Sequence, residues 1–269
     1  MNKVILILID GLGYQTSVNH CGYLEARVAS GTARRTRLVA ELPSMSRPLY
    51  ETVHTGVAPV VHGITSNDTV QCSKMPNIFG EVRRAGGGTA AAAFSWFSEL
   101  YNSAPFDRMR EAVQLDGDGA IQHGVFYEAE DTPDREVFQS ASALLHRHAP
   151  DYMLLHPMAS DHIGHKYGGD SRQYRTNATR VDTLVAEFAP AWEGLGYRIM
   201  VTADHGMNAD GYHGGSLDDV RHIAFYDFGA VEPGASDRDA SQTAVAPTVL
   251  AAMGLDIPET MKTPPLTGH

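Results

Sequence analysis

The sequence predicts a three-layer α/β/α fold with a mainly parallel sheet, and two observations support this prediction. Short apolar runs recur along the 269-residue chain, and between them lie segments whose apolar residues repeat at helical spacing. Strands that alternate with helices in this way form parallel sheets covered by helices on both faces. The runs expected to be strands are residues 3–9, 89–94, 151–156, 197–202 and 222–228.

The first run, residues 3–9, is the clearest strand. It is almost continuously apolar and is followed at once by Asp10 and Gly11, which suits a strand buried on both faces. Start signals and apolar spacing indicate helices between the strands. The expected helices cover residues 48–55, 75–84, 134–148, 171–188 and 243–253.

The chain length fits one catalytic domain over residues 1–269. Residues 95–133 are its least regular part, with aromatic residues scattered among polar and glycine positions. Two interpretations of this segment stay open. It forms either a small cap over a pocket or a crossover whose aromatic side chains fill gaps in the core.

Composition narrows the classes of partner. A formal net charge of -11 argues against binding a nucleic acid polymer. Small anionic substrates stay possible, because bound divalent cations invert the field around clustered aspartates. Cys21 and Cys72 are too few and too far apart for a disulfide framework, and the opening apolar run is too short to span a membrane. We therefore expect a cytoplasmic protein without a membrane partner; the oligomeric state stays open.

Acidic and histidine residues follow three of the predicted strands. Asp10 follows the first strand, Asp161 and His165 follow the run ending at residue 156, and Asp204 and His205 follow the run ending at residue 202. Ligands of open α/β sheets bind at the carboxyl ends of the strands. We therefore expect these side chains to meet at one edge of the sheet.

The spacing of these residues is typical of metal ligands. Asp161 and His165 are four residues apart, which places them on one face of a helical turn. His213 lies in a later polar loop and completes an Asp/His/His set, which suits zinc with an open coordination position. Manganese or iron would also be accommodated. Three other histidines are expected to be structural: His54, His62 and His162.

Ser46 is the candidate nucleophile. Pro48 two residues later indicates an opening helical turn, which places Ser46 where backbone amides and the helix dipole favour an anion. The alternative is that Ser46 only caps the helix. A serine needs activation to attack phosphorus, and coordination to a divalent ion supplies it.

Taken in order, these residues resemble the alkaline phosphatase superfamily, and most closely its type I phosphodiesterase/nucleotide pyrophosphatase family. The resemblance spans most of the chain and implies an alkaline-phosphatase-like core. The segments that carry it are Asp10-Gly11, the Ser46 region, His62-Gly63-Ile64-Thr65-Ser66-Asn67, Asp161-x-x-Gly164-His165 and Ala203-Asp204-His205-Gly206-Met207.

The resemblance also implies roles for single residues. Ser46 would be the nucleophile, at a position where phosphodiesterase members often have threonine, and Asn67 would hydrogen-bond a phosphoryl oxygen. Two divalent metal ions would be bound, with zinc as the expected metal. Their implied ligands are Asp10, Ser46, Asp204 and His205 for one ion, and Asp161, His165 and His213 for the other.

Three positions depart from the family pattern. Arg47 stands where many nucleotide-hydrolysing relatives have an aromatic residue; it either binds substrate phosphate or forms a structural ion pair. Only seven residues separate His205 from His213, as in the membrane-associated ethanolamine-phosphate transferases of the superfamily. Tyr50 stands where the sulfatase signature requires arginine, which disfavours sulfate esters.

Together these observations predict a two-metal-dependent phosphoric-ester hydrolase, similar to phosphodiesterases and nucleotide pyrophosphatases. It would act on a small phosphate ester through a phosphoseryl intermediate on Ser46. The alternatives are a phosphomonoesterase or phosphonate hydrolase, a phosphomutase or phosphotransferase, and a metal-binding protein without catalysis.

Overall fold

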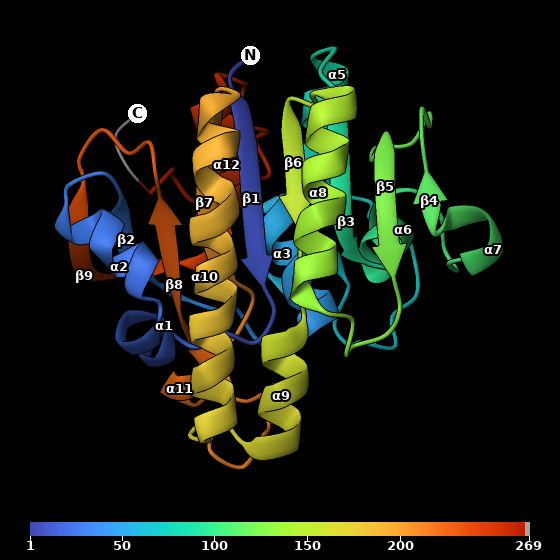
Figure 1. Cartoon of the computed structure of the whole chain (residues 1–269). Coiled ribbons are helices and arrows are strands. Elements are labelled where there is room, and N and C mark those ends of the chain that lie inside the picture. The colour runs from blue at the N-terminus through green and yellow to red at the C-terminus, as the bar shows by residue number, and fades with distance from the viewer. Residues whose placement is uncertain (267–269) are drawn as a thin grey trace.

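The computed structural model describes residues 1–266, and within them the chain forms one nine-stranded sheet in the order β4-β5-β3-β6-β1-β7-β8-β2-β9 (Figure 1). Its central strands run parallel, and residues 4–9 of the middle strand are each at most 1% exposed. This confirms the predicted mainly parallel sheet. The parallel strands are β5 (His123–Tyr127), β3 (Thr89–Phe94), β6 (Tyr152–Leu155), β1 (Lys3–Ile9) and β7 (Tyr197–Ala203).

The remaining strands lie toward the two edges of the sheet. β8 (His222–Asp227) is antiparallel to β7 and to β2 (Arg34–Val39), and β9 (Gly234–Ser241) pairs in parallel with β2. At the other edge, β4 (Val113–Gln114) is antiparallel to β5. The last three residues of the predicted 1–269 domain lie outside the described residues.

Helices cover both faces of the sheet, as the three-layer prediction requires (Figure 1). One face carries α1 (Tyr14–His20), α2 (Gly22–Ala29), α8 (Asp134–His148) and α10 (Arg172–Gly194). The other carries α3 (Ser46–Thr55), α5 (Ile78–Arg84), α6 (Trp96–Tyr101) and α12 (Val245–Met253). The other described helices are α4 (Pro59–His62), α7 (Arg108–Glu111), α9 (Ala159–Tyr167), α11 (Asp218–Arg221) and the 3-10 turn η1 (Gln242–Ala244).

Local sequence signals set several helix ends. The strands at 3–9 and 89–94 and the helix at 134–148 have the predicted bounds. α5 begins at residue 78, three residues later than predicted, because the Asn77 side chain caps it by accepting the Gly80 N–H at 3.0 Å. α10 continues past Pro190 to residue 194, since the buried Trp192 packs against Phe138 and Phe188.

Residues 95–133 form a crossover. The segment holds α6, α7, β4 and β5, and β5 pairs in parallel with β3, so it extends the sheet at its edge. Its aromatic residues fill the core: the ring of Phe97 stacks on Tyr50 of α3 at 4.5 Å between centroids. Of the two interpretations that the sequence left open, the structure matches the crossover.

Candidate active site

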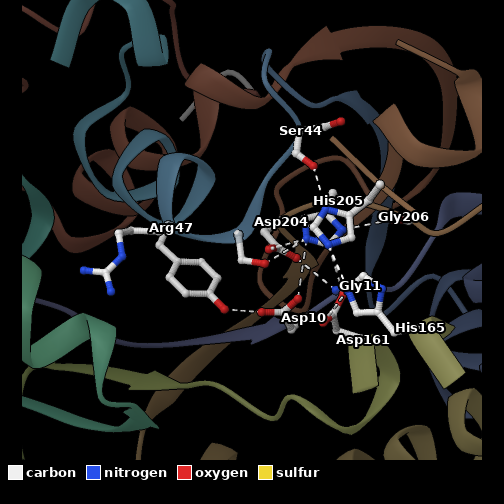
Figure 2. A network of polar contacts seen from close by, with 12 residues as sticks. Asp10, Gly11, Ser44, Arg47, Asp161, His165, Asp204, His205 and Gly206 are labelled. Atoms are coloured by element: carbon white, nitrogen blue, oxygen red, sulfur yellow. Dashed lines mark hydrogen bonds and ion pairs between the residues drawn. The ribbon is translucent and has the colours of Figure 1, made fainter. Parts of the chain in front are cut away.

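The predicted site residues come from segments far apart in the sequence and meet near the carboxyl edge of the parallel strands (Figure 2). Asp10 directly follows β1, and Asp204 and His205 directly follow β7. Asp161 and His165 lie on α9, which follows β6. This is the edge at which the sequence placed them.

The first cluster consists of Asp10, Asp204 and His205, whose ligand atoms all lie within 4.8 Å of one another. The Nε2 atom of His205 is 3.2 Å from Asp204 Oδ2 and 3.6 Å from Asp10 Oδ1. All three side chains are fully buried. Ser46 borders this cluster, with its Oγ atom 3.1 Å from His205 Nε2.

The second cluster consists of Asp161, His165 and His213, again with ligand atoms within 4.8 Å of one another. His165 Nε2 is 3.4 Å from Asp161 Oδ2 and 3.1 Å from His213 Nε2. The His165 side chain is 43% exposed, so solvent reaches this cluster. The two clusters adjoin, because the rings of His205 and His213 stack at 3.8 Å between centroids.

Backbone carbonyls orient all three imidazoles. The Nδ1 atoms of His165, His205 and His213 lie 2.8 to 2.9 Å from the carbonyl oxygens of residues 211, 206 and 44. A carbonyl only accepts, so each Nδ1 carries the proton and each Nε2 presents a lone pair to its cluster. Metal-binding histidines are held in the same way.

The carboxylates of the two clusters fit bound cations. Asp10 Oδ1, Asp161 Oδ1 and Asp204 Oδ2 are buried and receive no hydrogen bond from the residues that the structure describes. Burial and the nearby Asp10 carboxylate raise the pKa of both Asp161 and Asp204 well above its usual range. Burial lowers the pKa of His205 to about 3, so its imidazole is neutral. Buried carboxylates beside neutral imidazoles are the arrangement that divalent cations stabilise.

Ser46 occupies the first turn of α3, but it does not cap the helix through its side chain. Met45 is the N-cap residue, and the Ser46 hydroxyl instead faces His205. The structure therefore differs from the alternative in which Ser46 only caps the helix. The hydroxyl lies beside the first cluster at the positive end of the helix dipole.

Asn67 contacts the backbone of Arg47, the residue after Ser46. The Arg47 side chain turns away from both clusters (Figure 2). Asn67 Oδ1 accepts the Arg47 backbone N–H at 3.0 Å. The Arg47 guanidinium is buried 2.7 Å from Glu99 and lies 4.3 Å from the centre of the Trp96 ring. Of the two roles that the sequence left open for Arg47, this geometry matches the structural ion pair and leaves the side chain poorly placed to bind substrate.

Two glycines allow the close approach of these elements. Gly11 has a φ of +68°, and a Cβ atom there would lie 2.8 Å from the Cα atom of Asp161. Gly164 sits inside α9 between the two ligands of that helix, where a Cβ atom would lie 2.8 Å from the Met207 side chain. Its role is thus to let the helix pack against the loop after β7.

The sequence did not single out Tyr50 or His156 as site residues, yet both contact Asp10. The Tyr50 hydroxyl donates to Asp10 Oδ2, and His156 Nε2 lies 3.3 Å from the same oxygen. A usable signal existed for His156, because it ends the run at 151–156 and thus lies at the ligand-binding edge. Tyr50 had only helical spacing from Ser46 as a signal.

A third grouping of possible ligands, Asp116, His123 and His148, lies apart from these clusters, where β5 begins and α8 ends. Its histidine rings stack at 3.9 Å, and His123 Nδ1 already accepts the Asp116 N–H at 3.2 Å. Its lone pairs are therefore less well directed than those of the two clusters. In the described part of the chain, no helix is both long enough and apolar enough to cross a membrane.

Two similar proteins are both named GPI ethanolamine phosphate transferase 2. The chain is 25% identical to GPI ethanolamine phosphate transferase 2 of Aspergillus fumigatus over 227 residues, or 80% of this chain and 28% of that protein. It is 23% identical to the catalytic subunit of human GPI ethanolamine phosphate transferase 2 over 274 residues, or 96% of this chain. The chain thus spans about a quarter of the length of these relatives, 27% of the human one.

Solved structures share the fold at low sequence identity. Murine ectonucleotide pyrophosphatase/phosphodiesterase 5 superposes with a TM-score of 0.76 at 12% identity, covering 96% of both chains. A phosphonate monoester hydrolase from Silicibacter pomeroyi gives a TM-score of 0.68 at 16% identity, covering 99% of this chain and 76% of that one. The alkaline phosphatase PafA gives 0.68 at 11% identity and 98% coverage of both. These likenesses confirm the predicted alkaline-phosphatase-like fold.

The family model for type I phosphodiesterase/nucleotide pyrophosphatase matches residues 4–220, which run from β1 through both clusters to α11. This span includes every residue that the sequence placed in the site. The chain therefore belongs to the type I phosphodiesterase/nucleotide pyrophosphatase family.

Proposed function

We propose that this protein is a metal-dependent phosphoric-ester hydrolase in which Ser46 forms a covalent phosphoseryl intermediate. The observation that carries the proposal is the position of the Ser46 hydroxyl. It is buried, does not cap α3 and lies 3.1 Å from a ligand atom of the first cluster. The second cluster adjoins the first on the solvent side, where a leaving group can depart.

The reaction has two displacements at phosphorus. In the first, Ser46 gives up its hydroxyl proton and its Oγ atom attacks phosphorus, while the bond to the leaving oxygen breaks and that oxygen takes up a proton. In the second, water attacks the same phosphorus, the bond to Oγ breaks and the serine is restored. The N-terminal amides of α3 stabilise negative charge beside Ser46 in both steps.

Two divalent cations fit the donor sets of this site. Asp10, Ser46, Asp204 and His205 would hold one, and Asp161, His165 and His213 the other. When bound, such cations neutralise the carboxylates, lower the pKa of the serine hydroxyl and stabilise charge on the attacking and leaving oxygens. The mixture of carboxylate and imidazole donors suits zinc, with manganese or iron as alternatives.

Two side chains next to Ser46 bear on the substrate. The carbonyl oxygen of Asn67 accepts the Arg47 N–H. Its amide N–H₂ group can therefore donate to a non-bridging phosphoryl oxygen. The charge of Arg47 is already balanced by Glu99. A second phosphate charge would therefore gain little from Arg47, which favours singly charged diesters and phosphonate monoesters over doubly charged monoesters.

A paired screen tests the proposal. Metal-loaded protein is assayed against matched aryl phosphodiesters, phosphomonoesters and phosphonate monoesters, with Ser46→Ala and Ser46→Thr variants. We expect Ser46→Ala to lose at least about 1000-fold in kcat/KM while still binding metal, since it lacks the nucleophile. Ser46→Thr keeps a hydroxyl and should retain measurable turnover. Near-normal activity of Ser46→Ala on all three substrate classes would refute the assignment of Ser46 as the nucleophile.

A second candidate function is transfer of the phosphoryl group to an alcohol instead of water. The observation in its favour is the similarity to two proteins named GPI ethanolamine phosphate transferase 2. Both reactions share the Ser46 intermediate and differ only in what attacks it. Product analysis with an ethanolamine-bearing phosphodiester and rising concentrations of an acceptor alcohol separates them: hydrolysis yields the free acid throughout, whereas a transferase yields the new diester.

The setting of the reaction is part of the same proposal. We propose a small phosphate ester as substrate, with no nucleic acid polymer and no membrane as partner, and a cytoplasmic location. The acidic net charge of -11 supports the exclusion of a nucleic acid polymer as partner.

A further inference from the structure

His156 is a fully buried histidine that neither cluster includes. It follows β6 directly, and the rings of Tyr50 and Phe97 enclose it at 4.8 and 4.9 Å between centroids. Its Nε2 atom lies 3.3 Å from Asp10 Oδ2, which makes Asp10 its only ionic contact among the described residues. We therefore asked how this buried imidazole affects the Asp10 carboxylate that it faces.

The two oxygens of Asp10 have different surroundings. Oδ2 accepts the Tyr50 hydroxyl proton and faces His156. Oδ1 receives no hydrogen bond from the described residues and points toward His205, 3.6 Å from its Nε2 atom. The Tyr50 hydroxyl therefore hydrogen-bonds one oxygen from outside the cluster, and His156 lies at ion-pair distance from the same oxygen, while the other oxygen faces inward.

His156 is in turn fixed from behind. The Tyr127 hydroxyl donates to the His156 carbonyl oxygen at 2.6 Å and lies 3.4 Å from Nδ1 of the same residue. Tyr127 belongs to β5 and His156 follows β6, so the sheet itself sets the position of the ring. Contacts thus run in series from Tyr127 through His156 to Asp10.

The second cluster lacks this support. The Asp161 carboxylate faces His165 at 3.4 Å and His213 at 3.6 Å, both members of its own cluster. Its Oδ1 atom receives no hydrogen bond from the described part of the chain. His156 therefore contacts a carboxylate of the first cluster and none of the second.

We propose that His156 is a positioning residue that fixes Asp10 with Oδ1 directed into the first cluster, and thereby sets the cation affinity of that cluster but not of the second. The inference rests on the proposed function in taking Asp10 as a metal ligand. Residues that orient metal ligands in this way typically account for about 10- to 100-fold in metal affinity.

Calorimetric titration of the chelator-stripped full chain with Zn²⁺ tests the inference without any substrate. Asp10→Asn and Asp161→Asn identify the binding step of each cluster. We expect His156→Ala to weaken the first-cluster step about 10- to 100-fold and to leave the second unchanged. His156→Gln keeps an N–H donor and should recover most of the affinity. His162→Gln is the matched control, because that half-exposed histidine pairs with Glu130 at 3.8 Å outside both clusters.

Two results would overturn the inference: unchanged Zn²⁺ affinity in His156→Ala, or equal weakening of both steps. If His156→Ala does not fold, Tyr127→Phe takes its place. We expect this variant to lose less Zn²⁺ affinity than His156→Ala would, and only at the first cluster. Unchanged Zn²⁺ affinity at the first cluster would count against the inference. The proposed function fails separately. A Ser46→Ala variant that keeps its turnover would refute the nucleophile even if His156→Ala weakened only the first cluster.

Discussion

The two clusters use similar donors but differ in burial and support. The first, around Asp10 and Asp204, is sealed from solvent and contacts Tyr50, His156 and the serine-bearing helix α3. Two residues of the second cluster, Asp161 and His165, lie on α9, and the His165 side chain is 43% exposed. A nucleophile needs a fixed and dry position, whereas a leaving group and an incoming water need access. In the proposed mechanism, the first cluster would therefore position the nucleophile and the second would face the leaving group and water.

The largest expected effect comes from removing one imidazole from each cluster. His205→Ala should lower kcat/KM about 1000-fold, because no water reaches the buried position to replace the ring. His165→Ala should cost about 10- to 100-fold, since solvent can occupy the vacated position. Steady-state assays with zinc in excess measure both. Equal losses would show that the difference in burial has no functional meaning.

The next effect concerns α3, the helix that carries Ser46. Arg47→Met leaves Glu99 as an unpaired buried charge, so the free energy of unfolding should fall by about 3 to 5 kcal/mol. The matched control is Arg135→Met, whose solvent-exposed pair with Glu187 should change the free energy of unfolding far less. Denaturant titration measures both.

Arg47 also allows a check on substrate preference. In Arg47→Met the ratio of diester to monoester turnover should stay unchanged, since the guanidinium points away from the clusters. A selective loss of monoester turnover would mean that Arg47 leaves its ion pair to bind phosphate.

A pH-dependent effect is expected from Glu51, one turn after Arg47 on α3. Burial raises its pKa from 4.5 to about 7, against opposing hydrogen bonds from Ser73 and Tyr101. A raised pKa in the folded state contributes stability below pH 4.5 that is lost as the pH rises through about 7. Glu51→Gln should therefore be more stable than wild type at pH 8 by about 3 kcal/mol, a gap that closes toward pH 4.5. A gap independent of pH would contradict this.

The smallest effect tests the close approach of the clusters. Gly11→Ala places a Cβ atom against Asp161 at a φ of +68°, so it should lower both unfolding free energy and Zn²⁺ affinity. Gly31→Ala has a φ of +72° with nothing within 4 Å, so it should show only the backbone cost of about 1 to 2 kcal/mol. Unchanged Zn²⁺ binding in Gly11→Ala would argue against a tight fit between the clusters.

Much of the fold could be predicted because the central strands are continuous apolar runs, as in β1 and β3. β2 was not predicted for the opposite reason: it carries Arg34, Arg35 and Arg37, so its sequence is polar and not a continuous apolar run. The structure pairs these arginines with acidic groups far along the chain or on a neighbouring helix. Such pairings leave no local pattern.

The site was predictable where ligands follow strands or repeat at helical spacing, as for Asp10 and the Asp161–His165 pair. The direction in which a side chain points could not be predicted from the sequence. Arg47 follows Ser46 in the sequence, but its guanidinium lies against Glu99 and Trp96 from another helix. Tyr50 and His156 also acquire their contacts with Asp10 only when α3 and β6 pack together.

The central claim is that Ser46 becomes covalently bound to phosphorus. The most direct test is mass spectrometry of the metal-loaded protein, quenched in acid during turnover of an aryl phosphodiester and digested to peptides. We predict the mass of the phosphoryl group, with its remaining ester substituent, on the peptide that contains Ser46, and none on that peptide from Ser46→Ala. Turnover without any adduct, together with an undiminished rate in Ser46→Ala, would contradict the account.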